Sequence, residues 1–206
     1  MSNLFKVPEV GEILPDDCIT REPGESLFKF MSRSLYYRIE FTEKCGFVLW
    51  TKSSMDELAT IIKNDKWLEV MSGTGYLGNT MNRNYHSNII MTDDKSWKDG
   101  TLANSDIYKG IEQIDALDAI DKYHNDVKGV IMSWPPYDDP IAANVLNACY
   151  AYKLPIIYIG EFLDGCTADD VFFNSLIDSK YNCDDIIPSL RQFPGINDSA
   201  ILITMH

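Results

Sequence analysis

Apolar residues along the chain recur with two periods, which predict strands that alternate with helices. Short apolar runs indicate buried strands at 67–71, 88–94, 129–133, 155–160, 187–190 and 200–205. Helical spacing of apolar residues indicates helices at 25–39, 54–62, 117–123, 141–152 and 171–177, and a further helix that ends near 84. Such alternation is typical of a mostly parallel sheet with helices on both faces, so we predict an α/β fold.

The first part of the chain differs from the rest. Residues 1–24 contain several prolines and glycines without a sustained period, which predicts an arm over the surface. The apolar side of an amphipathic helix follows, with Leu27, Phe28, Met31, Leu35, Tyr36 and Ile39. A capping box at Ser54–Glu57 starts a second helix. We therefore expect residues 1–65 to form an arm and a helical cap, and residues 66–206 to form the sheet domain.

Two other stretches concern the edges of the sheet. Residues 187–190 and 200–205, joined by a turn at 193–198, predict an antiparallel ending. The stretch from Ile107 to Ile111 fits either a strand or a loop.

Length and composition indicate how many domains the chain forms and exclude some classes of protein. The 206 residues suffice for one domain with a sizeable core. No apolar run approaches the roughly 20 residues of a membrane span, and the start lacks a basic segment followed by an apolar core. The five cysteines have no C-x-x-C spacing and the three histidines form no H-x-x-x-H pair, so we expect reduced thiols and no metal site. We expect a soluble, cytoplasmic protein without a membrane partner.

The net charge of the chain indicates which kinds of binding partner are disfavoured. The net charge is −13, and the acidic residues are spread along the chain without a cluster of lysine or arginine. Such a surface repels phosphate backbones, so a nucleic-acid polymer is a disfavoured partner. A small molecule or a nucleoside remains compatible with this charge.

The stretch from Trp67 to Gly78 is the most informative about ligand binding. It reads as a buried strand, a turn containing Ser72, Gly73 and Gly75, and the start of a helix. The two turn glycines lack the Cβ atoms that would hold a ligand away from the backbone. The helix that follows would offer unpaired N–H groups at its positive end. We therefore expect a nucleotide-like ligand at this turn.

Two ligand classes fit the turn. A dinucleotide site needs G-x-G-x-x-G, which Gly73, Gly75 and Gly78 supply, with the acidic Asp93 about 20 positions on. A methyl-donor site needs an acidic residue four positions before the first glycine, where Glu69 stands. The long segment ahead of this strand favours the methyl donor, because a dinucleotide domain tends to open with the strand. A turn with only a structural role is the third possibility.

The sequence pattern E-x-x-x-G-x-G resembles the first motif of class I S-adenosylmethionine-dependent methyltransferases. This resemblance implies S-adenosyl-L-methionine as the cofactor, with Glu69 facing its methionine amino group. Asp93, or Asp94 as the alternative, would accept hydrogen bonds from the ribose hydroxyls. The pair Asp115 and Ala116 resembles the third motif, whose carboxylate accepts from the adenine amino group.

Each of these residues also has a structural interpretation. Asp93 can equally serve as a solvated turn residue or a helix N-cap, and Asp115 can cap the helix at 117–123. Trp97 can cover the adenine face or pack against the helical cap.

A second informative stretch is the turn Trp134-Pro135-Pro136-Tyr137, which follows a predicted strand. Two consecutive prolines stiffen the chain where it leaves the sheet, at the edge where such sheets bind ligands. The turn resembles the fourth motif of amino-methyltransferases, in which Asp, Asn or Ser precedes Pro-Pro-Tyr and holds the target amine. Here Trp134 occupies that position and Ser133 lies one residue too early. We expect this turn to form the acceptor side of the site.

Glu161 follows the next predicted strand and is a candidate general base or substrate clamp. The stretches Trp-Pro-Pro-Tyr-Asp-Asp-Pro, Gly-Cys-Thr-Ala-Asp-Asp-Val-Phe-Phe and Phe-Pro-Gly-Ile-Asn-Asp resemble a family of small methyltransferase-like proteins of bacteria and fungi. That resemblance covers residues 45–206. It implies a Rossmann-like, seven-stranded, mostly parallel sheet with an antiparallel C-terminal hairpin.

The function predicted from these motifs is methyl transfer from S-adenosyl-L-methionine to a small or nucleoside-like acceptor, by N-methylation. Two alternatives remain. The first is a protein that binds the methyl donor without turnover, because Trp134 replaces the polar residue of the fourth motif. The second is an NAD-dependent oxidoreductase, because the three glycines also satisfy the dinucleotide spacing.

Overall fold

The sheet at the centre of the molecule has seven strands in the order β3-β2-β1-β4-β5-β7-β6. The computed structural model describes residues 5–9, 11–99, 109–163, 165–177 and 180–206. The strands are β1 (Lys66–Val70), β2 (Asn88–Asp93), β3 (Ile111–Gln113), β4 (Gly129–Ser133), β5 (Ile156–Glu161), β6 (Tyr181–Asp185) and β7 (Asp198–Met205). Strands β1 to β5 pair in parallel, and β7 runs antiparallel to both β5 and β6. This arrangement confirms the predicted Rossmann-like sheet with an antiparallel ending.

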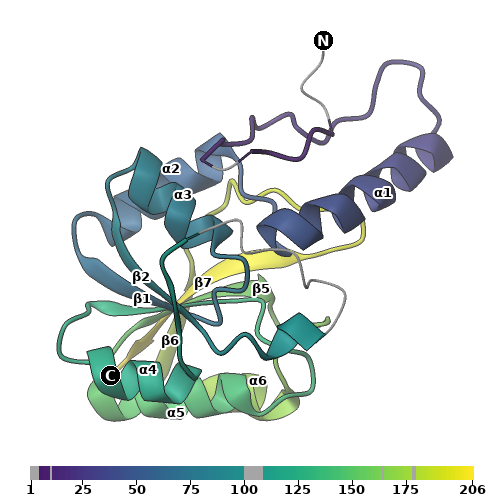
Figure 1. Ribbon diagram of the computed structural model, residues 1–206. Helices are drawn as coiled ribbons and strands as arrows, with labels where there is room; N and C mark the ends of the chain where they lie inside the picture. Colours follow the sequence, from purple (N-terminus) through teal and green to yellow (C-terminus); the bar gives the residue numbers. More distant parts are fainter. Residues whose placement is uncertain (1–4, 10, 100–108, 164, 178–179) are drawn as a thin grey trace.

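Helices cover both faces of this sheet (Figure 1). One face carries α1 (Leu27–Cys45), α2 (Lys52–Ile62) and α3 (Tyr76–Asn84), and the other carries α4 (Ala116–Tyr123), α5 (Ile141–Tyr152) and α6 (Asp170–Leu176). The strands send alternate side chains to two separate cores. In β5, Ile157 and Ile159 join the core under α1 to α3, whereas Ile156 and Tyr158 join the other core. Because both faces are buried, the strands appear in the sequence as continuous apolar runs.

The antiparallel ending uses a different stretch from the one predicted. The prediction of a strand at 187–190 is wrong, because these residues form a turn in which Leu190 N–H donates to the Ile187 carbonyl (3.0 Å). Besides β5, the strand that pairs with β7 is β6, in which only Tyr181 is buried and the other residues are exposed. An edge strand that faces water needs no apolar run, so periodicity does not reveal it. At the opposite edge, β3 begins at Ile111, and residues 107 and 108 lie outside the described part of the chain.

The helix predicted at the start of the chain is present as α1, but a different face of it is buried. The side chains expected to face the core are 42% to 82% exposed: Leu27, Phe28, Met31, Leu35, Tyr36 and Ile39. Tyr37 and Phe41 point into the core instead, and the Phe41 ring lies 5.5 Å from the ring of Phe193. Helix α1 therefore carries two apolar faces, and its sequence alone does not tell which one packs.

The arm ahead of α1 packs closely against α2. Leu14 and Cys18 are buried, and Lys52 N–H donates to the Leu14 carbonyl (2.8 Å). Asp16 accepts from both the backbone N–H and the hydroxyl of Ser53, at 3.0 and 2.7 Å, at the start of α2. In the described part of the chain, no helix has the length and apolar character to cross a membrane.

Truncating a side chain should affect the stability of the protein strongly on the buried face of α1 and only slightly on its exposed face. Phe41→Ala removes a fully buried ring, so we expect it to lower the free energy of unfolding by about 3–5 kcal/mol. Phe28→Ala removes a ring that is 82% exposed on the same helix, so we expect a change below about 0.5 kcal/mol. Urea unfolding of dilute protein measures both values. Similar losses in the two variants would contradict the orientation of α1.

Candidate functional site

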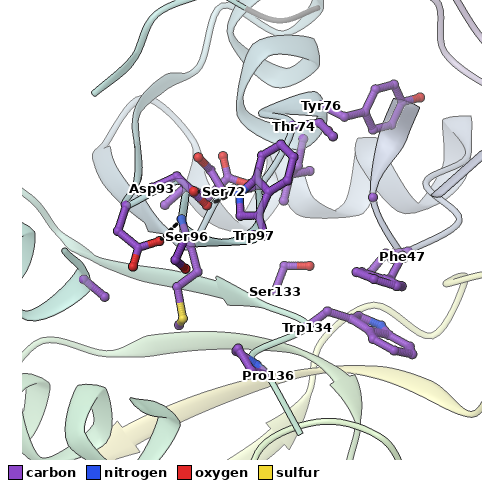
Figure 2. A pocket seen from close by; sticks show the side chains of 18 of the residues that line it. Phe47, Ser72, Thr74, Tyr76, Asp93, Ser96, Trp97, Ser133, Trp134 and Pro136 are labelled. Atoms are coloured by element: carbon purple, nitrogen blue, oxygen red, sulfur yellow. Dashed lines mark hydrogen bonds between the residues drawn. The ribbon is translucent and has the colours of Figure 1, made fainter. Parts of the chain in front are cut away.

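A cavity of about 550 Å³ lies at the carboxyl ends of β1, β2 and β4 (Figure 2). Its wall includes the turn after β1, the residues after β2, the start of α4 and the turn after β4. The end of α1 and the segment between α1 and α2 complete it. The chain order reverses at β1, because β2 lies on one side of it and β4 on the other. Open α/β sheets bind ligands at such a switch point. The volume also falls in the range of about 300–1,000 Å³ that is usual for ligand sites.

The turn after β1 is built from Ser72, Gly73 and Gly75. The two glycines have φ angles of +55° and +77°, in the left-handed region that favours glycine. A Cβ atom added to Gly73 would meet no atom within 4 Å, so the backbone there faces open space. The Ser72 N–H donates to the Thr92 carbonyl (3.0 Å) and fastens the turn to β2. The Ser72 hydroxyl is buried without a hydrogen-bond partner among the described residues, which leaves it available to a ligand.

Glu69 lies below this turn, on β1, and is almost fully buried. Its Oε2 accepts a hydrogen bond of 3.1 Å from the N–H of Gly78, in the first turn of α3. Burial raises the pKa of Glu69 to about 8; the bond from Gly78 opposes this rise and the nearby charge of Asp93 adds to it. A Cβ atom on Gly78 would lie 2.4 Å from this carboxylate. The third glycine of the motif therefore lets α3 approach Glu69.

Asp93, at the end of β2, connects the glycine turn to Trp97 (Figure 2). Its Oδ2 accepts from Gly73 N–H (2.7 Å), and its Oδ1 accepts from Lys95 N–H (2.7 Å) and from the indole N–H of Trp97 (2.8 Å). Burial raises the pKa of Asp93, although these three hydrogen bonds lower it. A carboxylate has about four acceptor positions, so about one remains for a ligand hydroxyl.

The other predicted donor-side residues also line the cavity. Asp94 is exposed and accepts from Ser96 N–H (2.9 Å). Asp115 caps α4 by accepting from Leu117 N–H (2.8 Å), which is the structural role considered from the sequence. It faces the cavity together with Ala116 and Trp97. Asp115 therefore combines the cap with a position on the cavity wall.

On the acceptor side, Ser133, Trp134 and Pro136 line the cavity. Trp134 has a φ angle of +49°, which is strained for a residue with a side chain. Its indole N–H donates to Oδ1 of the buried Asp198 (2.8 Å). Its ring stacks on that of Phe47 (Figure 2). The ring centroids are 4.8 Å apart and the ring planes differ by 12°. The Trp134 ring is thus fixed from two sides, by β7 and by the segment after α1.

Four predicted site residues do not line the cavity: Gly75, Pro135, Tyr137 and Glu161. Tyr137 is 67% exposed. Glu161 is buried, and its two carboxylate oxygens accept from the N–H groups of Cys166 (2.9 Å) and Asn197 (3.1 Å). Glu161 ends β5, which lies one strand farther from the switch point than β4, the strand that ends at Ser133. In this position Glu161 fastens two loops and does not reach a ligand in the cavity.

The N-terminal helical cap was expected to lie over the donor site, but none of its residues was predicted as a site residue. The last turn of α1 and the segment after it contribute Thr42, Cys45, Gly46, Phe47, Val48 and Trp50. The apolar run at 47–50 indicates burial, but its position beside the turn after β4 depends on how α1 packs. Asp139 was missed as well; it lines the cavity and accepts from Ile141 N–H (2.8 Å) at the start of α5.

The charged side chains of the cavity wall all have one sign. The acidic residues are Glu69, Asp93, Asp94, Asp115 and Asp139. Among the described residues, no lysine, arginine or histidine lines the cavity. Such a wall attracts cations and repels phosphate groups.

Glu69 predicts how the stability of the protein depends on pH. Its pKa is about 8 in the folded protein and about 4.3 in an unfolded chain. The folded state holds this proton more tightly, so its stabilising contribution is complete below about pH 4 and is lost as the pH rises to about 8. In Glu69→Gln this loss should be absent. We therefore expect the variant to lose less stability than the wild type between about pH 5 and 9, by several kcal/mol.

Thermal unfolding across this pH range measures the difference. Asp198, whose pKa burial raises to about 7, is present in both proteins and does not mask it. Parallel stability curves for the two proteins would contradict a buried, protonated Glu69.

Comparison with known proteins shows a likeness of fold. The sequence matches no protein-family model and none of the curated proteins. The structure is similar to the B. subtilis M1A22 tRNA methyltransferase TrmK, with a TM-score of 0.50 and 15% identity over 75% of this chain and 66% of that chain, just under two thirds. It is also similar to a putative O-methyltransferase from Klebsiella pneumoniae (TM-score 0.49, 13% identity, 89% of this chain and 92% of that chain). A third is an RNA methyltransferase from Salinibacter ruber in complex with S-adenosyl-L-homocysteine (TM-score 0.43, 11% identity, 75% and 91%). At 15% identity, the likeness to the B. subtilis enzyme shows a shared Rossmann-like fold.

Proposed function

We propose that this protein is an S-adenosyl-L-methionine-dependent methyltransferase that acts on a small or nucleoside-like acceptor. The observation behind this proposal is that carboxylates already occupy two of the N–H groups that a dinucleotide could use. Asp93 accepts from Gly73, and Glu69 accepts from Gly78 at the start of α3. A pyrophosphate normally binds such N–H groups. Here it would displace two acids and meet a wall without basic residues.

A sulfonium cation suits the same wall. S-adenosyl-L-methionine carries a positive sulfur and an ammonium group, and its ribose and adenine offer hydrogen-bond donors. Acidic residues of the cavity wall lie on β1, at and after the end of β2, after β3 and after β4: Glu69, Asp93, Asp94, Asp115 and Asp139. The buried, unpartnered hydroxyl of Ser72 adds a polar group close to the glycine turn. The residues present therefore fit the methyl donor better than they fit NAD.

The proposed orientation follows the order of the residues along the cavity. Glu69 and Ser72 would hold the methionine end, and Asp93 or Asp94 the ribose hydroxyls. The adenine would lie near Trp97, Asp115 and Ala116. In this orientation the methyl group faces the turn after β4, where Figure 2 shows Ser133 and Trp134.

In the reaction, the bound donor supplies a methyl group on a sulfonium, which the lone pair of the acceptor displaces in line. The protein contributes mainly position, because the methyl group is already activated. Ser133 can hydrogen-bond to an acceptor amine, and the Trp134 ring shapes the space beside it. Glu161 lies outside the cavity, so the proton released by the amine goes to Asp139 or to water. Asp139 thus takes the place that the sequence assigned to Glu161.

The charge of the cavity wall also limits which molecules can serve as the methyl acceptor. An acceptor that carries phosphate would meet four aspartates, the carboxyl group of Glu69 and no basic side chain, and the whole chain has a net charge of −13. Similar folds serve proteins named for tRNA and for O-methyl transfer, so the fold leaves the acceptor open. The electrostatics favour a neutral or cationic small molecule over a nucleic-acid polymer.

A donor-binding protein without turnover is the second candidate. The observation that favours it is the stack of Phe47 on Trp134, which fills the acceptor side of the cavity with two rings. Formation of S-adenosyl-L-homocysteine separates the two candidates, because only an enzyme produces it.

Isothermal titration calorimetry tests the choice of ligand. We expect binding of S-adenosyl-L-methionine and no response to NAD. Asp93→Asn should weaken donor binding by about 1.5–3 kcal/mol, the usual value of a hydrogen bond to a charged group. Asp118→Asn, on an exposed position of α4 outside the cavity, is the matched control and should change nothing. Tight NAD binding without a response to the methyl donor would overturn the proposal.

Turnover depends on the acceptor side. With a panel of small amines, Ser133→Ala should lower kcat several-fold to about tenfold, the effect of one lost hydrogen bond. Its donor affinity should stay within about 0.5 kcal/mol of the wild type. Tyr137→Ala, at an exposed position outside the cavity, should preserve both values. Loss of activity in Tyr137→Ala with normal activity in Ser133→Ala would reverse these two roles.

A further inference from the structure

Helix α1 exposes an apolar surface that its packing in the monomer leaves uncovered. We define the α1 stripe as Leu27, Phe28, Met31, Leu35, Tyr36 and Ile39. Most of these residues are three or four positions apart, which places them along one side of a helix. Their side chains together expose on the order of 800 Å², more than the roughly 300–600 Å² of the largest apolar patch on a typical monomer.

The stripe belongs to a well-fixed helix. Ser26 caps α1 by accepting from Lys29 N–H (3.2 Å), and Tyr37 and Phe41 anchor its other face in the core. Arg33 pairs with Glu25 at 2.7 Å and ties the N-terminal half to the arm. In Figure 1 this half of α1 projects beyond the sheet. The stripe is thus presented on a rigid support and is accessible.

We propose that the α1 stripe pairs with the α1 stripe of a second copy of this chain, with the two helices antiparallel. The exposed area is close to the ~800 Å² that each partner contributes to a standard protein–protein interface. A two-fold symmetric dimer also needs a surface that is complementary to itself. The charges beside the stripe meet this requirement.

Those charges are Lys29 and Glu40, both exposed. They are eleven positions apart, which is three helical turns, so they lie on the same flank of the stripe. In an antiparallel pair, equal flanks face each other with their ends reversed. Lys29 therefore meets the partner's Glu40, and Glu40 meets the partner's Lys29. The symmetry axis then passes beside Leu35, near the middle of the stripe.

The charges beside the α1 stripe favour a second copy of this chain as its binding partner. Within the described residues, neither Lys29 nor Glu40 forms an ion pair in the monomer, so both are free for the partner. An anionic membrane or a nucleic acid would be repelled by a net charge of −13. The pairing concerns a surface outside the cavity and does not depend on the proposed methyl donor.

Sedimentation equilibrium of the full chain tests the interface. We expect the wild type to form dimers at micromolar concentration. Leu35→Arg places a charge beside the axis in both copies and should raise the dissociation constant at least about 100-fold. Val171→Arg changes an apolar residue of similar exposure (62%) on α6, on the opposite face of the sheet, and should leave the dissociation constant unchanged. Circular dichroism checks that both variants are folded.

A charge exchange tests the antiparallel register. Lys29→Glu and Glu40→Lys should each weaken the dimer several-fold, because each creates two like-charge contacts. The double variant, and equally a mixture of the two single variants, should restore dimerisation. A wild type that stays monomeric, a dimer that survives Leu35→Arg, or a double variant without restored affinity would overturn the proposal. Wild-type monomers that bind phosphatidylserine vesicles would also overturn it, and would assign the stripe to lipid.

Discussion

Two buried carboxylates on neighbouring strands hold the glycine turn, and the character of the cavity depends on them. Glu69 accepts from the first turn of α3, and Asp93 accepts from Gly73 in the turn itself. They neutralise the backbone N–H groups that would otherwise make this edge of the sheet a phosphate site. The same glycine spacing that serves dinucleotides elsewhere therefore surrounds an acidic cavity here, and an acidic cavity suits a cationic donor. Burial raises the pKa of Glu69, because the ionised carboxylate is less well solvated inside the protein than in water.

The turn after β4, which we propose as the acceptor side, is held by contacts that join distant parts of the chain. Asp198 on β7 fixes the Trp134 indole, and Phe47, which follows α1, covers its ring. The antiparallel ending and the N-terminal helix thus meet at the turn after β4. Because α1 leads directly into this wall, the packing of Tyr37 and Phe41 in the core determines the shape of the cavity. A dimer formed through the exposed side of α1 would stiffen the same helix.

The sequence predicted the sheet and the place of the cavity, because buried parallel strands and glycine turns leave local signals. It did not predict β6, whose exposed edge position needs no apolar run. It placed Glu161 in the site because an acid at the end of a strand resembles a catalytic group, yet that carboxylate accepts from two loop N–H groups and does not line the cavity. The buried face of α1 and the position of Phe47 depend on tertiary packing between segments far apart in the chain. Local periodicity carries no information about such packing.

A crystal structure of the protein with S-adenosyl-L-methionine tests whether the acidic cavity is a methyl-donor site. The account predicts the donor in the cavity between the glycine turn and Asp115, with its ammonium group towards Glu69 and its methyl group towards Ser133 and Trp134. Soaking with NAD should leave the cavity free of the dinucleotide. A pyrophosphate bound to the N–H groups of Gly73 and Gly78, with Asp93 and Glu69 displaced, would contradict the account.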